Sequence, residues 1–273
     1  MSIVAISQTL GSLGEEIGHE VARRLSYDFA DREIILQAAD RFGEGVATMQ
    51  HWTEEKPTIW ERLTETRRRY LGYVEAIVWE LAARDNVVLV GRGATFILQG
   101  VRHALRVRIN APPSLRARRL EDRLGLTPDT AELIRSSDRE RAARIRFVYH
   151  VEWDEPLHYD LVLNTERIDV EAAARLIETA VGTERFRATP PGLAETRDQS
   201  LVARAEAALL VNPVTRDLSL FVICREGHLT VSGRVTREDQ RRVAEEVLTH
   251  LPGATRVLCE IAVVPPAPTV APL

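Results

Sequence analysis

The sequence predicts an α/β protein in which helices cover both faces of a parallel sheet, followed by a small α+β domain. Over residues 1–182, short apolar runs rich in Val, Leu and Ile alternate with amphipathic helical patterns. Such runs are typical of parallel strands buried between two layers of helices. Over residues 199–264 the order of patterns becomes α-β-β-α-β. With 45% hydrophobic residues, the 273-residue chain can form a substantial core.

Each element of the first domain follows from its residue pattern. The expected strands are Ile3–Ser7, Tyr27–Ala30, Val87–Val90, Ala104–Asn110 and Tyr159–Asn164. The expected helices are Glu16–Leu25, Arg32–Phe42, Ile59–Ala83, Ser114–Leu124, Thr130–Val151 and Val170–Val181. In the first helix, Ile17, Val21 and Leu25 recur on one face. Ligands of such sheets bind at the carboxyl ends of the strands, so the loops that follow the strands are candidate sites.

A break in the pattern separates the two domains. Residues 183–198 contain Pro190, Pro191 and Gly192, which cannot continue a preceding helix, and we predict an interdomain linker there. The elements expected in the second domain are the helices Leu201–Leu210 and Arg237–His250 and the strands Asp217–Arg225, Leu229–Gly233 and Val257–Val263. The proline-rich residues 265–273 are predicted to form a disordered tail.

Composition excludes several classes of protein. The net charge of −4 gives no overall signature of binding to nucleic acid. The two cysteines, Cys224 and Cys259, argue against a disulfide scaffold and against a cysteine-based metal site. We see neither a signal peptide nor an apolar run long enough for a transmembrane helix, so we expect a cytoplasmic protein without stable membrane insertion. The run Arg67-Arg-Arg69 indicates a solvated helix face or a contact in a homo-oligomer.

The most informative stretch follows the first strand. Gly11, Ser12 and Gly14 form a tight turn that leads directly into a helix. A strand, a Gly-rich turn and a helix N-terminus together aim backbone N–H groups at an anion, so we predict phosphate binding here. The alternative is an ordinary strand-to-helix turn, in which Gly and Ser are common anyway. The Ser12 hydroxyl is the candidate ligand for Mg²⁺.

This turn lacks the lysine of a standard phosphate-binding loop. The pattern G-x-x-x-x-G-K-[ST] uses Lys to neutralise phosphate charge and a hydroxyl to hold Mg²⁺. Gly14, Glu15 and Glu16 stand where those residues would be, and Lys56 is the single lysine of the chain. Glu15 and Glu16 suit the helix dipole but repel phosphate, so we expect weak nucleotide binding.

Taken with this turn, several motifs resemble the cytidylate kinase-like family, a relative of the nucleoside monophosphate kinases. The matching motifs are Ile6-Ser7, Gly11-Ser12, Gly14, Glu16-Ile-Gly18, Asp31-Arg-Glu-Ile-Ile35, Val88-Leu-Val-Gly-Arg-Gly-Ala94, Ser137-Asp-Arg139 and Tyr159-Asp-Leu-Val-Leu-Asn-Thr165. The sequence departs from the family at Gln8, Leu13 and Glu15, where Arg, Gly and Arg are common. The resemblance implies a P-loop kinase-like fold, a nucleotide ligand, and ATP and Mg²⁺ as cofactors.

The resemblance also implies further site residues. Arg92 follows a buried strand and corresponds to an arginine that contacts the monophosphate substrate; planar, bidentate Arg suits phosphate oxygens. The alternative is that Arg92 pairs with a nearby carboxylate. Asp31 follows the second strand and either lines the same cleft or caps the next helix.

A third group of residues resembles the lid of these kinases, whose arginines close over the phosphates and exclude water. The group comprises Arg116, Arg119, Asp138, Arg139 and Arg141, and we assign charge stabilisation in the transition state to Arg116, Arg119 and Arg139. The surrounding residues 102–146 contain twelve arginines and six acids. A solvated helix with acidic partners is an equal alternative.

The C-terminal region looks like a BON domain. The resemblance rests on Gly227-His-Leu-Thr-Val-Ser-Gly-Arg-Val235 and Leu251-Pro-Gly-Ala-Thr-Arg-Val257. BON domains are usually linked to membrane or ligand association in exported proteins, and the ligand in this chain is not evident from the sequence.

Three hypotheses about function follow. In the first, the protein uses ATP to phosphorylate a nucleoside monophosphate. In the second, it is a catalytically lapsed kinase that senses nucleotide or acts as a scaffold through its BON domain. In the third, it is an adaptor without a ligand. Glu15 favours the second and third hypotheses, whereas Arg92 and the lid arginines favour the first two.

Overall fold

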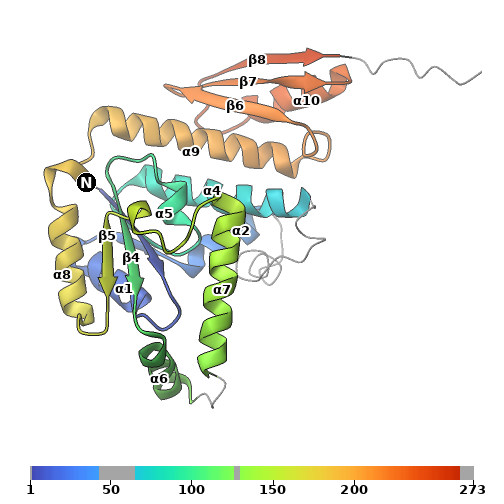
Figure 1. Cartoon of the computed structure of the whole chain (residues 1–273). Helices are drawn as coiled ribbons and strands as arrows, with labels where there is room; N and C mark the ends of the chain where they lie inside the picture. Colours follow the sequence, from blue (N-terminus) through green and yellow to red (C-terminus); the bar gives the residue numbers. More distant parts are fainter. Residues whose placement is uncertain (1, 43–64, 126–129, 265–273) are drawn as a thin grey trace, which may run out of the picture.

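The computed structural model describes residues 2–42, 65–125 and 130–264 (Figure 1). Its first unit contains a five-stranded parallel sheet with the strand order β2-β3-β1-β4-β5. The strands are β1 Ile3–Gln8, β2 Asp28–Ala30, β3 Val87–Val90, β4 Ala104–Asn110 and β5 Leu161–Asn164. The predicted tail 265–273 and residues 59–64 of the predicted helix lie outside the described residues.

Helices cover both faces of this sheet, as the sequence predicts. The helices of the first unit are α1 Gly14–Leu25, α2 Arg32–Phe42, α4 Glu65–Arg84, α5 Ala94–Ile97, α6 Pro113–Leu124, α7 Thr130–Tyr149 and α8 Val170–Val181. On one face, Val4 and Ile6 of β1 join a core cluster with residues of α1 and α8. On the other face, Ile3 and Ala5 join a cluster with α2, α4 and α5. This alternation is the two-residue period of a strand.

The strand register brings three loops to one edge of the sheet. Ile6 of β1 lies beside Val90 of β3, and Gln8 lies beside Ile109 of β4. The turn after β1, the loop after β3 and the loop after β4 therefore meet at the carboxyl edge. Helices α6 and α7 extend from this edge (Figure 1), and they pack against Leu10 of the turn through a small apolar cluster.

The second unit has the predicted order α-β-β-α-β. Its elements are α9 Pro190–Val211, β6 Leu220–Arg225, β7 His228–Val235, α10 Glu238–Thr249 and β8 Arg256–Val263. Strands β6 and β7 form an antiparallel hairpin, and β8 runs parallel to β7. The inner face of this three-stranded sheet packs on α9 and α10.

The prediction of an irregular linker over residues 183–198 is wrong for residues 190–198, which are helical. Helix α9 begins at Pro190 and continues for 22 residues, and it is preceded by a short 3₁₀ helix at Glu184–Phe186. Proline is tolerated in the first turn of a helix, where its missing N–H is not needed. The Thr189 hydroxyl also accepts a hydrogen bond from the Gly192 N–H at 3.2 Å and so caps the helix. Pro190 therefore starts a helix.

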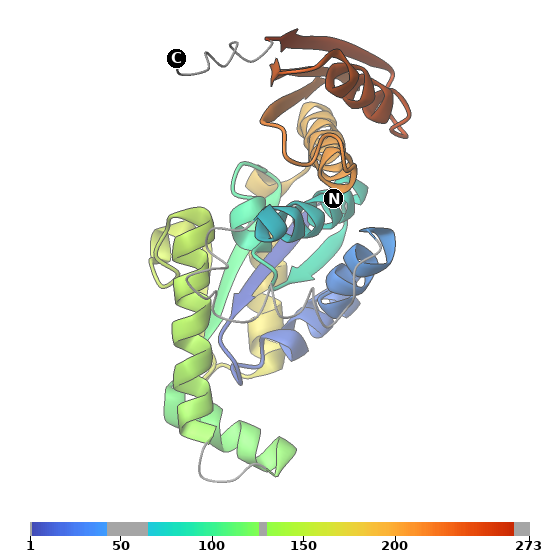
Figure 2. The same cartoon turned by 90° about the vertical axis from the view of Figure 1, so that its right-hand side faces the viewer.

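Helix α9 is shared by the two units (Figures 1 and 2). One stripe, formed by Ala203, Ala207 and Leu210, belongs to the core cluster of the first unit and packs beside α4. A second stripe, formed by Leu201, Ala205 and Leu209, belongs to the core of the second unit. The approach to α4 is close: a Cβ atom at Gly72 would lie 2.8 Å from Leu210 Cδ1.

Asp198 fastens α9 to the β6–β7 hairpin. Its carboxylate accepts hydrogen bonds from the backbone N–H groups of Glu226 at 2.7 Å and Gly227 at 2.9 Å, and from the Cys224 thiol at 3.2 Å. Burial raises the pKa of Asp198, but these donors outweigh burial and leave the pKa below its ordinary value. The carboxylate therefore stays charged and holds the hairpin turn against the helix.

Among the described helices, none has the length and apolar character needed to cross a membrane.

We predict that the shared helix makes the stability of the first unit depend on α9. Replacing Ala207 with Leu adds volume to a fully buried contact with α4, and such overpacking costs about 1–3 kcal/mol. All four tryptophans lie in residues 52–153, so tryptophan fluorescence reports on the first unit alone. In a urea titration, Ala207→Leu should lower the midpoint of the fluorescence transition.

The control is Ala194→Leu, which adds the same atoms to an exposed position of α9. It should change the free energy of unfolding by less than about 0.5 kcal/mol. An unchanged fluorescence midpoint in Ala207→Leu would show that α9 contributes nothing to the first unit.

Candidate functional site

The turn after β1 depends on unusual backbone conformations. Gly11 has φ of 78° and Leu13 has φ of 65°, both in the left-handed region. This region costs a residue with a side chain roughly 1–2 kcal/mol, and glycine is the usual occupant. Leu13 stands where the resembled family commonly has glycine. The backbone shape that glycine favours is therefore kept although the residue has changed.

Ser12 is buried inside the turn. Its hydroxyl group contacts the carbonyl oxygen of Thr9 at 2.8 Å and that of Ile109 at 3.2 Å, and the residue is fully inaccessible to solvent. The hydroxyl therefore braces the turn against β4. This geometry gives no support to the predicted role of Ser12 as a magnesium ligand, because the oxygen faces the interior of the protein.

Gly14 is required by a close contact. A Cβ atom at this position would lie 2.4 Å from Oε1 of Gln8, which is well inside van der Waals contact. The Gln8 side chain therefore lies against the first residue of α1. Gln8 is one of the positions where the sequence departs from the family, and the structure places it at the turn.

The start of α1 has no capping side chain. Leu13 is the N-cap residue and provides no side-chain hydrogen bond, so the first N–H groups of the helix lack the partner that a capping side chain would supply. A pocket opens beside this helix start, lined by Gln8, Leu10, Gly11, Leu13, Glu15, Glu16, Arg119, Leu120, Arg123 and Arg141. Anions bind favourably at such a helix terminus.

Arg116 lies under the turn as a structural contact. Only 2% of its surface is exposed. Its guanidinium donates to the backbone oxygen atoms of Ala111 at 2.9 Å and Leu10 at 3.2 Å, and to both carboxylate oxygens of Asp138 at 3.1 Å and 2.6 Å. These bonds occupy the guanidinium with protein atoms. The geometry thus assigns Arg116 a positioning role in place of the predicted contact with the transferring group.

The other two predicted lid arginines differ in placement. Arg119 lines the pocket, and its guanidinium donates to the hydroxyl of Thr165 at 2.9 Å and to its backbone oxygen at 2.7 Å. Arg139 lies elsewhere: its side chain is 65% exposed and pairs with Glu132 on the same helix. The structure therefore brings Arg119, but not Arg139, to the turn.

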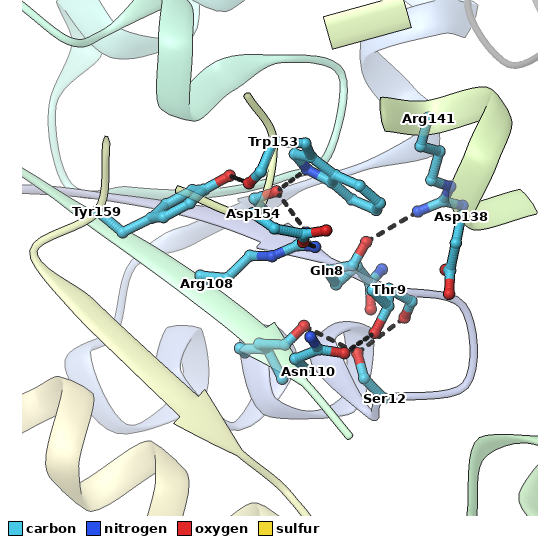
Figure 3. Close-up of polar contacts among 12 residues, drawn as sticks. Gln8, Thr9, Ser12, Arg108, Asn110, Asp138, Arg141, Trp153, Asp154 and Tyr159 are labelled. Atoms are coloured by element: carbon cyan, nitrogen blue, oxygen red, sulfur yellow. Dashed lines mark hydrogen bonds and ion pairs between the residues drawn. The ribbon is translucent and has the colours of Figure 1, made fainter. Parts of the chain in front are cut away.

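Arg141 is the arginine of α7 that reaches the turn (Figure 3). It donates to the backbone oxygen of Gln8 at 3.0 Å and lines the pocket. The spacing of residues along the helix distinguishes Arg141 from Arg139. Ile134, Asp138, Arg141 and Ile145 follow one another at three- and four-residue steps on the face that meets the protein, and Arg139 lies off that face.

Arg92 lies beside Asp31, so the structure shows the alternative in which Arg92 pairs with a nearby carboxylate. Arg92 Nε lies 3.9 Å from Asp31 Oδ1, and both side chains are largely buried. Arg92 has φ of 53° between two glycines that also have positive φ. A Cβ atom at Gly93 would lie 2.2 Å from the Tyr149 hydroxyl, so this loop is packed tightly against the end of α7.

A second buried arginine, Arg108, lies near the turn and was not predicted from the sequence. Its guanidinium carbon lies 3.6 Å from the ring centre of Trp153. The guanidinium donates to Ser7 Oγ at 3.2 Å and to Asp154 Oδ1 at 2.7 Å (Figure 3). Burial lowers its pKa from the ordinary value, and Tyr159 and Asp154 oppose that shift. One feature of the sequence could have indicated this residue: Arg108 is an arginine at an inward position of the buried strand β4.

The residues of this edge fit ATP and Mg²⁺ in chemical type. The open amides of α1 and the arginines Arg119 and Arg141 suit phosphate oxygens. Glu15 and Glu16 line the pocket, and carboxylates are ligands that Mg²⁺ accepts beside phosphate. Glu16 pairs with Arg123 at 3.0 Å, which partly neutralises its charge.

The model of the cytidylate kinase-like family matches residues 3–167, and that of the BON domain matches residues 197–265. A cytidylate kinase of Methanocaldococcus jannaschii is 33% identical over 37% of this chain, which spans 59% of that protein. A cytidylate kinase of Natronomonas pharaonis is 27% identical over 66% of this chain and 88% of its own length.

A solved structure shows the same fold. An uncharacterised protein from Eubacterium ventriosum aligns over 67% of this chain and 100% of its own length, with a TM-score of 0.54 and 18% identity. The parallel sheet, the turn at its carboxyl edge and the match over more than half of the residues agree with one another. This chain belongs to the cytidylate kinase-like family, and it carries a BON domain after the kinase-like unit.

Proposed function

We propose that this protein binds a nucleotide at the turn after β1 and transfers a phosphoryl group from ATP to a nucleoside monophosphate. The observation that carries the proposal is the uncapped start of α1, which opens into a pocket that Arg119 and Arg141 line at the carboxyl edge of the sheet. Phosphoryl transfer needs positioning and positive charge more than covalent chemistry. The relatives named cytidylate kinase support this reaction class.

In this proposal the donor phosphates lie against the Gly11–Gly14 backbone. Arg119 and Arg141 supply the positive charge that a lysine supplies in a standard loop. They come from α6 and α7, and each is already held by a backbone oxygen or a threonine near the turn. The turn itself is kept in shape by Ser12 and Arg116.

Mg²⁺ would be held at the pocket by Glu15 or Glu16 together with phosphate oxygens, and it would neutralise charge that develops on the phosphates. Carboxylates placed there would repel a bare triphosphate. The same carboxylates become favourable contacts once a divalent cation lies between them and the phosphates.

The acceptor would lie on the other side of the turn. Arg92 and Asp31 form a largely buried pair at the ends of β3 and β2, which lie two and three positions along the sheet from β4, the strand that leads into α6. In the proposal, the Arg92 guanidinium binds the acceptor phosphate, and Asp31 orients Arg92.

A second candidate function is a catalytically lapsed kinase that senses nucleotide. Glu15 stands in the pocket without the lysine that would offset it, and this favours binding over fast catalysis. The shared helix α9 supplies a physical link to the BON domain, because the same helix contributes to both cores. In this candidate, occupancy at the turn alters the BON domain through α9.

We predict that, in the absence of Mg²⁺, Glu15→Arg binds ATP more tightly than the wild type. The change removes a repulsive carboxylate and adds a charge-assisted donor at the helix start, which is worth about a tenfold change in affinity. Calorimetric titration of ATP with and without Mg²⁺ measures it. The charge-matched control is Glu184→Arg, an exposed site in the short 3₁₀ helix after α8, which should leave the affinity unchanged.

Two results would contradict this placement of the phosphates. If Glu15→Arg binds ATP no better in the absence of Mg²⁺, the phosphates do not lie at the start of α1. If the gain equals that of Glu184→Arg, it reflects the net charge of the protein alone.

We predict slow turnover, well below the roughly one per second at the slow end of kinases. The Glu15 carboxylate opposes the charge of Arg119 and Arg141, and a weakened contact where negative charge develops typically costs about 3 kcal/mol, or roughly a hundredfold in rate. A coupled assay with ATP and a panel of monophosphates measures the rate. Arg92→Ala should abolish the remaining turnover by removing the acceptor contact.

The assay separates the two candidate functions. Turnover that disappears in Arg92→Ala supports the kinase. Binding of ATP without turnover for any monophosphate supports the sensor. Turnover at or above about one per second would contradict the prediction of slow turnover.

A further inference from the structure

Arg108 combines a deeply buried cation with an exposed partner. Its side chain is 4% exposed, whereas the side chain of Asp154, which it contacts at 2.7 Å, is 75% exposed. A buried charge needs strong compensation, because its removal from water is unfavourable. The stacked Trp153 ring and the Ser7 hydroxyl supply part of it. The carboxylate reaches the guanidinium from the solvent side.

Arg108 lies on the same face of the sheet as core residues of β2 and β3, the strands that lead to Asp31 and Arg92. On β4 it shares the strand face of Ala104, which joins the core cluster that also contains Ala30 of β2 and Leu89 of β3. The loops after β2 and β3 carry Asp31 and Arg92. The aromatic cluster of Phe96, Trp153 and Tyr159 also bridges the two sites, because Tyr149 packs on this cluster and touches the Gly93 loop.

We propose that Arg108 is a second contact for the anionic group of the phosphoryl acceptor, and that the Asp154 carboxylate holds this position until the acceptor binds. The inference rests on the proposed function and adds to it a specificity-determining residue. A phosphate and a carboxylate present the same pair of oxygens to an arginine. The carboxylate that enters from solvent is thus the group a substrate anion would replace.

The substrate class follows from the charges. Arg92 and Arg108 together present two guanidinium groups on the acceptor side of the sheet, and a monophosphate brings up to two negative charges to them. A neutral nucleoside would leave both cations without added compensation. The site therefore selects an acceptor with a phosphate over the same acceptor without one.

The test uses the full chain and calorimetric titration with CMP, cytidine and inorganic phosphate as probes. Asp154→Asn keeps the shape of the side chain and removes its charge, so it should tighten CMP binding about three- to tenfold. Arg108→Met keeps an apolar stem against Trp153 and should weaken CMP binding at least tenfold. Neither change should alter the affinity for ATP at the turn.

The chain offers a matched control on the same strand. Arg106 forms a similar ion pair with Asp160, at 2.9 Å, nearer the amino end of β4. Arg106→Met and Asp160→Asn should leave the CMP affinity unchanged within twofold. Binding of cytidine should respond to none of the four changes, and inorganic phosphate should follow the CMP pattern if the phosphate alone is recognised.

Each outcome bears on the proposal. If Asp154→Asn weakens CMP binding or leaves it unchanged, the carboxylate is not a placeholder and the inference is overturned, even if Arg108→Met fails to fold. If CMP binding responds to Arg92→Ala but not to Arg108→Met, the inference fails while the proposed function stands. If wild-type protein binds ATP but no monophosphate, the proposed reaction fails as well.

Discussion

The candidate site depends on one buried arginine. Arg116 joins the backbone of the turn, the loop after β4 and Asp138 of α7 through a single guanidinium group. Because α6 carries Arg116 and α7 carries Asp138, this group fixes how the two helices are placed against the turn. Arg119 and Arg141 lie on those helices and reach the pocket only because of that placement. A buried guanidinium that makes four hydrogen bonds to three neighbouring residues gives such a junction a defined geometry.

The positive charge of this site comes from different elements than the positive charge of a lysine-bearing loop. A lysine would arise from the helix that begins at the turn, and its charge would move with that helix. Here the positive charge comes from α6 and α7, which are separate from α1 in the sequence, while α1 contributes carboxylates. The charge at the pocket therefore depends on how these three helices are packed. The two arginines proposed to contact the acceptor, Arg92 and Arg108, likewise come from different strands.

The fold and the turn could be predicted because their signals are local. The apolar strands, the glycines of the turn and the pair of Arg92 and Asp31 each follow from short patterns at strand ends. The roles predicted for Ser12, Arg116 and Arg139 depend on the direction in which each side chain points. A sequence motif does not give that direction. The linker prediction is wrong over residues 190–198 because proline ends a helix from within but starts one at the first position. Arg108 was missed because its partners are 46 and 101 residues away in the sequence.

The dual packing of α9 has a consequence for how the chain resists proteases. A ligand that binds only the native form adds its binding free energy to the stability of every segment that must unfold with the site. Since α9 contributes side chains to both cores, cleavage that requires α9 to unwind must also disrupt the core beside α4. If the turn unfolds together with that core, a ligand bound at the turn would also protect peptide bonds in α9 that it never touches.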